Sequence, residues 1–334
     1  MNILIVRVSS LGDVVHNMPM VADIRRHFPD ANIDWVVEEA YTSLVGLNSA
    51  VRHVIPFALR RWRHSLLSAA TRSEMRAFYR SLRRESYDIV FDTQALIKTG
   101  VVMRMACLAP GGRRVGLANA TEGSGYEGIS RVFHTLSVPV DARTHAVQRA
   151  RLVAAAAFGY TVDSAADFMM GEPSVTPAWL PAEPYAVFFH GTARASKQWP
   201  EAHWVEVGRA LAARGMPVLL AWGNMVEQQA AQRLAANIPN ALVLPKLPLD
   251  EALALARHAA LAIGVDTGLT HVAAAFGRPT IELYCDSPRW KTEGNWSPAI
   301  INLGDLGAPP APAEVQSAVA SLLGPVNRPR PEAL

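Results

Sequence analysis

Four closely spaced prolines divide this sequence into two halves. They occupy positions 173, 177, 181 and 184, and neither a helix nor a central strand crosses such a segment. The chain has 334 residues, which is enough for two domains that each have a core. We therefore predict a first domain at residues 1–172, a linker at 173–184 and a second domain at 185–312.

Short apolar runs alternate with segments of helical periodicity on both sides of the prolines. Residues 2–8 form a near-continuous apolar run, which is typical of a strand buried on both faces of a parallel sheet. Further strands are predicted at 33–37, 54–55, 89–91, 114–117, 185–190, 217–221, 241–244, 259–265 and 280–283. This alternation predicts an α/β fold with two parallel sheets, which would face a central cleft at the carboxyl ends of their strands, where open sheets bind ligands.

Composition narrows the classes of partner. The formal net charge is only +3, so it does not indicate a nucleic-acid-binding protein. The two cysteines, Cys107 and Cys285, give no disulfide framework and suit a reducing cytoplasm. The first eight residues indicate a strand rather than a signal peptide, and no uncharged apolar run reaches the roughly 18 residues of a membrane span. Any contact with lipid is therefore expected to be peripheral.

Residues 264–271, Gly-Val-Asp-Thr-Gly-Leu-Thr-His, lie between an apolar run and a helical segment. A strand, a glycine-bearing turn and a helix N-terminus together form an anion site, because the first-turn amides lack intrahelical acceptors. Thr267 adds a hydroxyl, Gly268 lets a ligand approach the backbone, and His271 can donate to phosphate oxygens. The alternative is an ordinary helix capped by Asp266 or Thr267, with a packing histidine.

The first strand leads into Ser9-Ser10-Leu11-Gly12-Asp13, which departs from the glycine pattern of dinucleotide sites. An unperturbed aspartate has a pKa of about 3.9, so Asp13 is expected to be ionised at neutral pH. A carboxylate at the end of a strand can accept a proton from an attacking hydroxyl. Capping of the following helix is the alternative role for Asp13.

Residues 60–84 contain eight arginines and one acidic residue, Glu74. Arg60, Arg61 and Arg63 crowd a predicted loop, where like charges repel unless an anion lies among them. A small polyanion or an anionic lipid headgroup fits this cluster better than nucleic acid, because only Trp62 is placed to stack on a base. The arginines at 72, 76, 80 and 84 form one helical stripe, for which a solvated charged face is the alternative.

In the second half, the strand at 185–190 leads into a loop of small and hydroxyl residues. Its amides can approach a phosphate, and Lys197 supplies a mobile positive charge. Glu227 follows the next strand, where a carboxylate commonly accepts hydrogen bonds from a ribose. A plain surface loop and an exposed glutamate are the alternatives. The sequence shows neither metal-site spacing nor a nucleophile elbow, which disfavours a covalent hydrolase.

Taken together and in this order, several of these segments resemble the lipopolysaccharide heptosyltransferases. They are Ile-Val-Arg-Val-Ser-Ser-Leu-Gly-Asp-Val-Val-His at 5–16, Arg-Arg-Trp-Arg at 60–63, Lys-Gln-Trp-Pro at 197–200 and Val-Asp-Thr-Gly-Leu-Thr-His at 265–271. The likeness covers nearly the whole chain, and Asp-Trp-Val-Val-Glu-Glu at 34–39 resembles the type I heptosyltransferases in particular. It implies a GT-B fold of two Rossmann-like domains, with the helix at 313–323 packing back on the first. The tail at 325–334 is predicted to be disordered.

The resemblance also implies an activity. It implies an inverting, metal-independent transfer of L-glycero-D-manno-heptose from ADP-heptose to a Kdo residue of Kdo-lipid A, without a cofactor and without nucleic acid. The enzyme would work in the cytoplasm, in peripheral contact with the inner membrane of a Gram-negative bacterium. Loss of a diphosphate needs positive charge rather than a general acid, which agrees with a single carboxylate base.

Carried over to this sequence, the resemblance assigns a role to each candidate residue. Asp13 would be the general base, and Lys197 would stabilise the leaving diphosphate. The donor would be bound by Thr192, Lys197, Glu227, Asp266, Thr267, Gly268 and His271. The acceptor would be bound by Ser10, Arg60, Arg61, Arg63, His64 and His145.

The chain departs from the family pattern at three places. His64 stands where a lysine is common, Ala193 replaces a second threonine, and residues 118–130 match poorly, so no acceptor arginine can be assigned there. Other functions stay open: a heptosyltransferase that adds a later heptose, a sugar-nucleotide epimerase of the same fold, or a non-catalytic polyanion-binding module. A nicotinamide dehydrogenase is disfavoured by the absence of the GxGxxG pattern.

Overall fold

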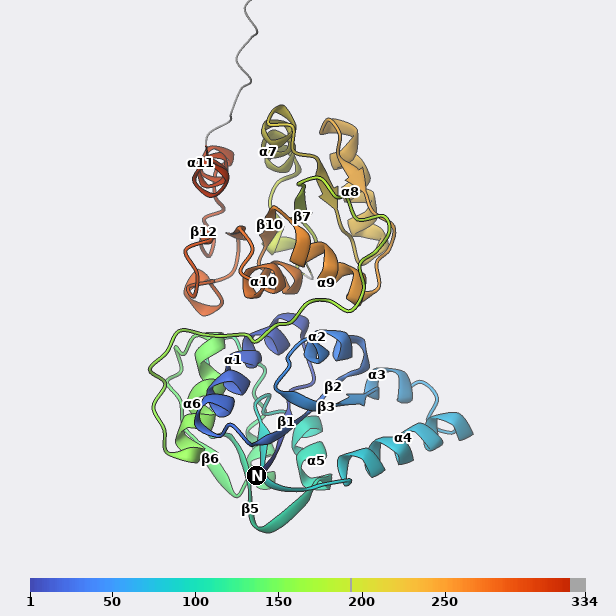
Figure 1. The fold of residues 1–334 in the computed structure, drawn as a ribbon, viewed down its shortest axis with the longest axis vertical. Helices are drawn as coiled ribbons and strands as arrows, with labels where there is room; N and C mark the ends of the chain where they lie inside the picture. The colour runs from blue at the N-terminus through green and yellow to red at the C-terminus, as the bar shows by residue number, and fades with distance from the viewer. Residues whose placement is uncertain (193, 325–334) are drawn as a thin grey trace, which may run out of the picture. The chain divides into compact units, whose positions relative to one another are not determined.

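The structure is a computed structural model that describes residues 1–192 and 194–324. The chain divides into two compact units, Met1–Glu172 and Pro173–Leu334, here called unit 1 and unit 2. In each unit a sheet is flanked by helices (Figure 1). Ala193 and the tail at 325–334, for which disorder was predicted, lie outside the described residues.

Unit 1 is built on six parallel strands in the order β3-β2-β1-β4-β5-β6. The strands are β1 (Asn2–Val6), β2 (Asn32–Glu38), β3 (Val51–Phe57), β4 (Ser86–Asp92), β5 (Cys107–Leu117) and β6 (Leu136–Val138). The helices are α1 (Leu11–His27), α2 (Thr42–Gly46), α3 (Leu59–Trp62), α4 (Ala69–Leu82), α5 (Ile97–Met105) and α6 (Ala146–Phe158). The first strand is central, because Ile3 pairs with Ile33 on one side and with Ile89 on the other.

Unit 2 repeats this plan with six parallel strands in the order β12-β11-β10-β7-β8-β9. The strands are β7 (Ala186–Phe189), β8 (Val218–Leu220), β9 (Leu242–Val243), β10 (Leu261–Val265), β11 (Thr280–Tyr284) and β12 (Ile300–Gly304). The helices are α7 (Glu201–Ala213), α8 (Met225–Asn237), α9 (Leu249–His258), α10 (Gly268–Ala275) and α11 (Pro312–Leu323).

Burial of the central strands explains why both sheets carry helices on two faces. Every residue of β7, β10 and β11 is buried, as are Ile3–Val6 of β1. In unit 1, Leu4 and Val6 pack with Phe78 and Leu82 of α4, while α1 and α6 pack on each other. An apolar strand without alternation therefore predicts correctly a sheet that is covered on both sides.

The final helix belongs to unit 2. Val315, Ala318 and Val319 of α11 are buried in the same core as Trp204 and Val207 of α7. The expectation that this helix packs back on the first domain stays a prediction. Its apolar positions recur at helical spacing and complete a core that α7 leaves open.

The predicted strands are found, most with small shifts in their ends, although β5 begins seven residues before the strand predicted at 114–117, and two strands were not predicted. β6 has only three residues, and β12 follows a segment rich in Trp, Gly and Pro that gives no strand pattern. The helix α1 runs from Leu11 to His27 and contains Pro19 in its interior. Among the described residues, the structure contains no helix that is both long and apolar enough to cross a membrane.

Candidate functional site

The carboxyl end of β1 brings the first candidate residues together. The strand ends at Val6, and α1 begins at Leu11 with Ser10 as its N-cap. Asp13 is the third helical residue, so it accepts a hydrogen bond from the Ser10 amide at 3.0 Å and from the Ser10 hydroxyl at 2.8 Å. The capping role is thus realised, and Asp13 still keeps about a third of its side chain exposed (36%).

Two arginines hold the charge of Asp13. Arg7 Nη2 lies 2.7 Å from Asp13 Oδ1, and Arg149 Nη2 of α6 lies 3.9 Å from the same oxygen. Desolvation alone would raise the pKa of Asp13, but Arg7, the Ser10 donors and Arg149 together hold it well below its usual range. The carboxylate is therefore ionised at every physiological pH, as a proton acceptor must be before reaction.

Neither arginine was singled out from the sequence. Arg7 and Arg149 are both nearly buried. Arg7 also donates a hydrogen bond to the Thr93 carbonyl, and Arg149 donates one to the Thr121 hydroxyl. The sequence feature that could have identified them is an arginine at a position where the strand or helix pattern predicts an apolar residue. Isolated buried cations are costly, so each requires a nearby anion or acceptor.

Asp92 ends the neighbouring strand β4 and is fully buried. It accepts hydrogen bonds from the amides of Gln94 and Ala95 and from the hydroxyl of Thr99, all at 3.0 Å. Burial raises its pKa to about 6 despite these donors and the nearby Arg7. Asp92 therefore orders the loop after β4 next to the Arg7 side chain.

The arginine cluster is paired largely within the protein. Arg61 contacts Glu39 through Nε and Nη2 and Glu74 through Nη1, at 2.7 to 3.0 Å. Arg60 Nε lies 3.9 Å from Glu38 Oε2. The inference that crowding here requires an external anion is therefore wrong for Arg61, because carboxylates distant in sequence supply the negative charge.

The remaining members of the cluster are exposed. Arg63 and His64 form no ion pair within the described part of the chain, so both are available to an anionic ligand. The cluster lies on the short helix α3 and not on a loop, and its Trp62 is buried against Phe57 and Phe78. The suggestion that Trp62 could stack on a base is corrected, because its ring belongs to the core.

His145 lies at the N-cap of α6, where its Nδ1 accepts a hydrogen bond from the Val147 amide at 3.2 Å. Arg149 follows four residues later, and residues at this spacing share one helix face. The start of α6 is therefore the element that brings His145 and Arg149 to the side of unit 1 on which Asp13 lies.

In unit 2, the carboxyl ends of β7 and β10 are joined by an ion pair. Lys197 Nζ donates to Asp266 Oδ2 at 2.5 Å. The other oxygen of Asp266 lies 3.0 Å from His271 Nε2, and His271 Nδ1 lies 3.0 Å from Glu282 Oε1. Three predicted donor-site residues therefore form one network, which ends on a glutamate that was not predicted.

His271 is buried between two carboxylates, which decide its protonation state. Burial alone would lower its pKa, but Glu282 and Asp266 raise it to about 10, so the buried ring is an imidazolium. Desolvation would raise the pKa of Asp266, but His271 and Lys197 hold it far below its usual range. Because both ring nitrogens face carboxylates, direct donation from His271 to a phosphate is corrected to a positioning role through Asp266.

The helix after this network presents free amides. Thr267 is the N-cap of α10 and makes no side-chain capping bond, so its half-buried hydroxyl is not used by the helix. Gly268 is the first helical residue, and its amide precedes the first intrahelical hydrogen bonds. Thr192 is half-buried in the loop that leads to Lys197. Together these groups offer neutral donors and one cation, the set that a diphosphate requires.

Glu227 lies over the ends of β7 and β8. Its Oε2 accepts from the Gly223 amide at 2.7 Å and its Oε1 from the Asn224 side chain at 2.8 Å. A Cβ built on Gly191 would lie 2.5 Å from Glu227 Cδ, which shows how closely the carboxylate covers that turn. The carboxylate is thus held rigidly next to the loop that carries Thr192, as a ribose acceptor should be.

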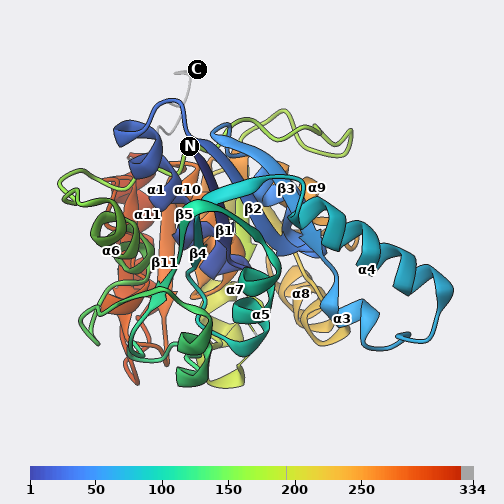
Figure 2. The same ribbon diagram turned by 90° about the horizontal axis from the view of Figure 1, so that it is seen from below.

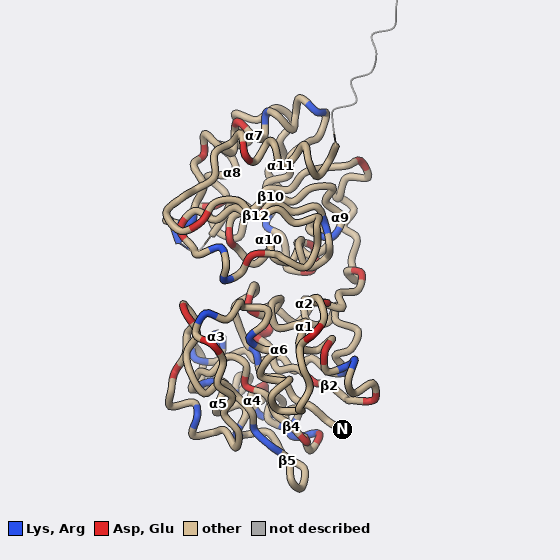
Figure 3. Tube along the Cα trace, turned by 90° about the vertical axis from the view of Figure 1, so that its left-hand side faces the viewer, with Lys and Arg blue, Asp and Glu red and all other residues tan. Residues whose placement is uncertain are grey.

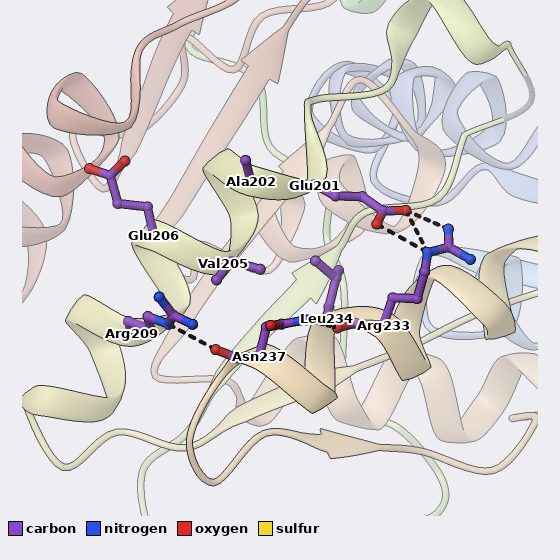
Figure 4. A pocket seen from close by; sticks show the side chains of 8 residues that line it. All are labelled: Glu201, Ala202, Val205, Glu206, Arg209, Arg233, Leu234 and Asn237. Atoms are coloured by element: carbon purple, nitrogen blue, oxygen red, sulfur yellow. Dashed lines mark hydrogen bonds and ion pairs between the residues drawn. The ribbon is translucent and has the colours of Figure 1, made fainter.

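Two further observations concern the surroundings of these groups. Within residues 1–192 and 194–324, no three side chains of His, Cys, Asp or Glu are arranged to hold a metal ion. A groove on unit 2 lies between α7 and α8 and is lined by the Glu201–Arg233 ion pair and by Arg209 and Asn237 (Figure 4). None of the candidate residues lines this groove.

Comparison with known proteins identifies the family. Residues 75–319 match the model of glycosyltransferase family 9 (heptosyltransferase). The chain is 38% identical to lipopolysaccharide heptosyltransferase 1 of Pseudomonas aeruginosa over 85% of its own length and 78% of that protein.

Solved structures of the Escherichia coli heptosyltransferase WaaC share the fold. The complex with ADP has a TM-score of 0.83 and 31% identity, and it covers 96% of this chain and 100% of that one. The complex with ADP-2-deoxy-2-fluoro heptose has a TM-score of 0.76 and 32% identity, covering 97% and 99%. The fold is accordingly GT-B, with a Rossmann-like domain in each unit. The chain belongs to glycosyltransferase family 9, the heptosyltransferases, and transfers heptose in the synthesis of the lipopolysaccharide core.

Proposed function

We propose that this heptosyltransferase moves L-glycero-D-manno-heptose from ADP-heptose to a Kdo residue of Kdo-lipid A. The donor is supported by the WaaC complexes with ADP and with a fluorinated ADP-heptose, since Thr192, Lys197 and Thr267 offer a diphosphate its donors. The acceptor is supported by the similarity to a heptosyltransferase named as type 1. The single observation that carries the proposal is the ionised, partly exposed carboxylate of Asp13 at the carboxyl end of β1.

The chemistry follows from these groups. The Asp13 carboxylate accepts the proton of the Kdo hydroxyl while that oxygen attacks the anomeric carbon of heptose. The bond from that carbon to the diphosphate breaks, and ADP leaves with the electron pair. Lys197 and the first amides of α10 stabilise the charge that develops on ADP, so no protonated acid is needed.

Inversion and independence from metal are part of the same proposal. A single displacement inverts the anomeric carbon, because the nucleophile enters opposite the leaving group. The hydrogen bonds from Ser10 and the ion pairs with Arg7 and Arg149 stabilise Asp13 as a carboxylate, the form that accepts the proton of the attacking hydroxyl. Lys197 supplies at the diphosphate the positive charge that a metal supplies in other transferases.

The test is the release of ADP from purified protein and ADP-heptose, measured with and without Kdo-lipid A. We expect release only with the acceptor, and a product that carries one heptose on Kdo. Turnover that requires a heptosylated acceptor would overturn the proposed acceptor. Conversion of ADP-heptose without any acceptor would overturn the transfer itself. Full activity in excess EDTA checks the absence of a metal requirement.

A further inference from the structure

The helix α4 carries an unusual outer face. Its inner side is fixed by Thr71, Phe78 and Leu82, which are buried, and Phe78 packs on Trp62 of α3. At about 100° per residue, the exposed side chains occupy one continuous arc on the remaining surface. In order around that arc they are Met75, Tyr79, Arg72, Arg76, Arg80, Ser73, Ala77 and Ser81. The arc is therefore apolar at one margin, cationic in the middle and small or weakly polar at the other margin.

The loop before α4 extends the apolar margin. Leu66 is 53% exposed and Leu67 is 88% exposed, and Met75 and Tyr79 follow at 40% and 43%. Figures 1 and 2 both show α3, this loop and the start of α4 projecting away from the sheet of unit 1. Leucines at the tip of a projecting element contribute nothing to the core. Exposed apolar side chains grouped in this way favour contact with an apolar surface.

The arginines within α4 on this face form no ion pair in the described chain. Arg72, Arg76 and Arg80 are exposed and form no ion pair there, whereas the one acidic residue of the helix, Glu74, is taken by Arg61. Figure 3 marks the positions of the basic residues along the chain. A face with several unpaired arginines and no free carboxylate attracts an extended anionic surface.

The arginines of α4 and the neighbouring leucines together indicate which kind of partner fits this face. A small anion would satisfy the arginines but leaves Leu66 and Leu67 in water, and an apolar partner leaves the arginines unpaired. A bilayer with anionic headgroups satisfies both, since arginines contact headgroups while adjacent apolar side chains enter the acyl boundary. We propose that α4 and the loop at residues 65–68 form a docking surface for an anionic lipid membrane.

The proposed surface is distinct from the residues assigned to heptose transfer. It consists of Arg72, Arg76, Arg80, Leu66 and Leu67 with Met75 and Tyr79, and none of them belongs to the donor or acceptor assignments. Arg61 links α3 to α4 through Glu74, so membrane binding fixes the orientation of the element that carries Arg60 and Arg63. Because lipid binding is measured without substrates, its failure would leave the proposed transferase function intact, and the converse also holds.

The experiment is flotation of the full-length protein with vesicles. One set contains only phosphatidylcholine, and the other contains roughly a quarter phosphatidylglycerol as the anionic lipid. We expect binding to the anionic vesicles only, and weaker binding as the salt rises to about 0.5 M, where the Debye length falls well below 10 Å. Equal binding to both sets, or none to the anionic set, would overturn the proposal.

Two pairs of variants locate the surface. R76Q/R80Q removes two exposed arginines of α4, and R209Q/R233Q removes two exposed arginines of unit 2. Each arginine near an anionic surface contributes about fivefold in partitioning, so R76Q/R80Q is expected to lower it about 25-fold and the control less than twofold. L67S is expected to lower it about tenfold, whereas L306S, at a 60% exposed leucine of unit 2, leaves it unchanged.

Self-association is the competing explanation for this face. Sedimentation velocity of the wild-type protein and of R76Q/R80Q distinguishes the two occupants. A dimer that this variant disrupts, together with an absence of vesicle binding, would assign the face to a second copy and overturn the proposal. Turnover of ADP-heptose with a short, soluble Kdo acceptor is expected to be the same in R76Q/R80Q and wild type. Unchanged vesicle binding in R76Q/R80Q would also overturn it.

Discussion

Lys197 and Asp266 are 69 residues apart in sequence, and their side chains meet at 2.5 Å. This ion pair fixes the loop after β7 to the turn after β10, and Asp266 is itself fixed by His271. The lysine therefore has a defined position before any diphosphate arrives. Preorganised charge of this kind contributes most to the stabilisation of a leaving anion.

Lys197→Gln is expected to lower turnover about 10²–10³-fold, because the developing charge on ADP loses its cation. Calorimetry should show weaker ADP binding as well. Lys246→Gln, at an exposed lysine of the same unit, is the matched control and should behave as wild type. Equal activity of the two variants would contradict the assigned role of Lys197.

Asp13→Asn tests the base. The amide keeps a hydrogen-bond acceptor for the Ser10 amide but loses the charge, so turnover is expected to fall about 10²–10⁴-fold with ADP affinity unchanged. Ser10→Ala separates the two roles of Asp13, since it removes the hydroxyl donor and leaves the carboxylate. It should cost about 0.5–2 kcal/mol of stability and lower turnover only by the fraction of molecules whose first turn is frayed, a far smaller loss than in Asp13→Asn. An active Asp13→Asn would refute the base assignment.

The Gly191→Ala variant tests the ribose contact. The three atoms nearest to a Cβ at this position all belong to the flexible Glu227 side chain, which can move to accommodate it. The carboxylate must move away from Gly223 and Asn224, and we expect ADP affinity to fall about tenfold with little change in stability. Gly46→Ala, where nothing lies within 4 Å, is the control. Unaltered ADP binding in Gly191→Ala would show that Glu227 does not contact the donor.

Stability should depend on pH through His271. Its folded-state pKa of about 10 lies above the value near 6.5 of the unfolded chain, so protonation stabilises the folded state. That contribution is complete below about pH 6.5 and is lost as the pH rises through about 10. Urea unfolding between these values should show declining stability in the wild type. His271→Gln should be less stable throughout and lack this slope, and a parallel slope in both proteins would contradict the linkage.

Acceptor affinity should depend on Arg63 more cleanly than on Arg61. Arg63→Ala removes an exposed charge, so we expect a higher KM for Kdo-lipid A and an effect that shrinks as salt rises. Arg61→Ala also leaves Glu39 and Glu74 without their partner, so it should lower the thermal stability of the α3–α4 region in addition. Identical KM values for Arg63→Ala and wild type at low salt would exclude Arg63 from the acceptor site.

The fold was largely readable from local patterns. Strands such as β1 and β10 are apolar without alternation, which only a sheet covered on both faces explains. β6 and β12 escaped prediction because a three-residue strand has no period, and β12 is defined by its partner β11. The contact of α11 with the core of unit 2 was not predicted, because amphipathic spacing gives a face but not the core that covers it.

The site was readable to the extent that local chain geometry creates it. The turn at 264–271 and the start of α1 bring their own residues together, so the sequence could propose Asp266, His271 and Asp13 as candidates. Glu282 was not predicted because it lies inside an apolar strand. Its part in the network is visible only in the structure, where it is buried next to His271. The pairing of Arg61 with Glu39 depends on residues far apart in sequence, which no window of sequence reports.

The capping bond between Ser10 and Asp13 gives one side chain two duties. The same oxygen that closes the first turn of α1 also lies at the proposed proton-accepting site, so fraying of that turn would swing the carboxylate aside. Substitutions that loosen the start of α1 should then slow catalysis in proportion to the fraction of molecules with a frayed turn. A substitution at this position that lowers the stability of the first helical turn is therefore expected to lower turnover as well.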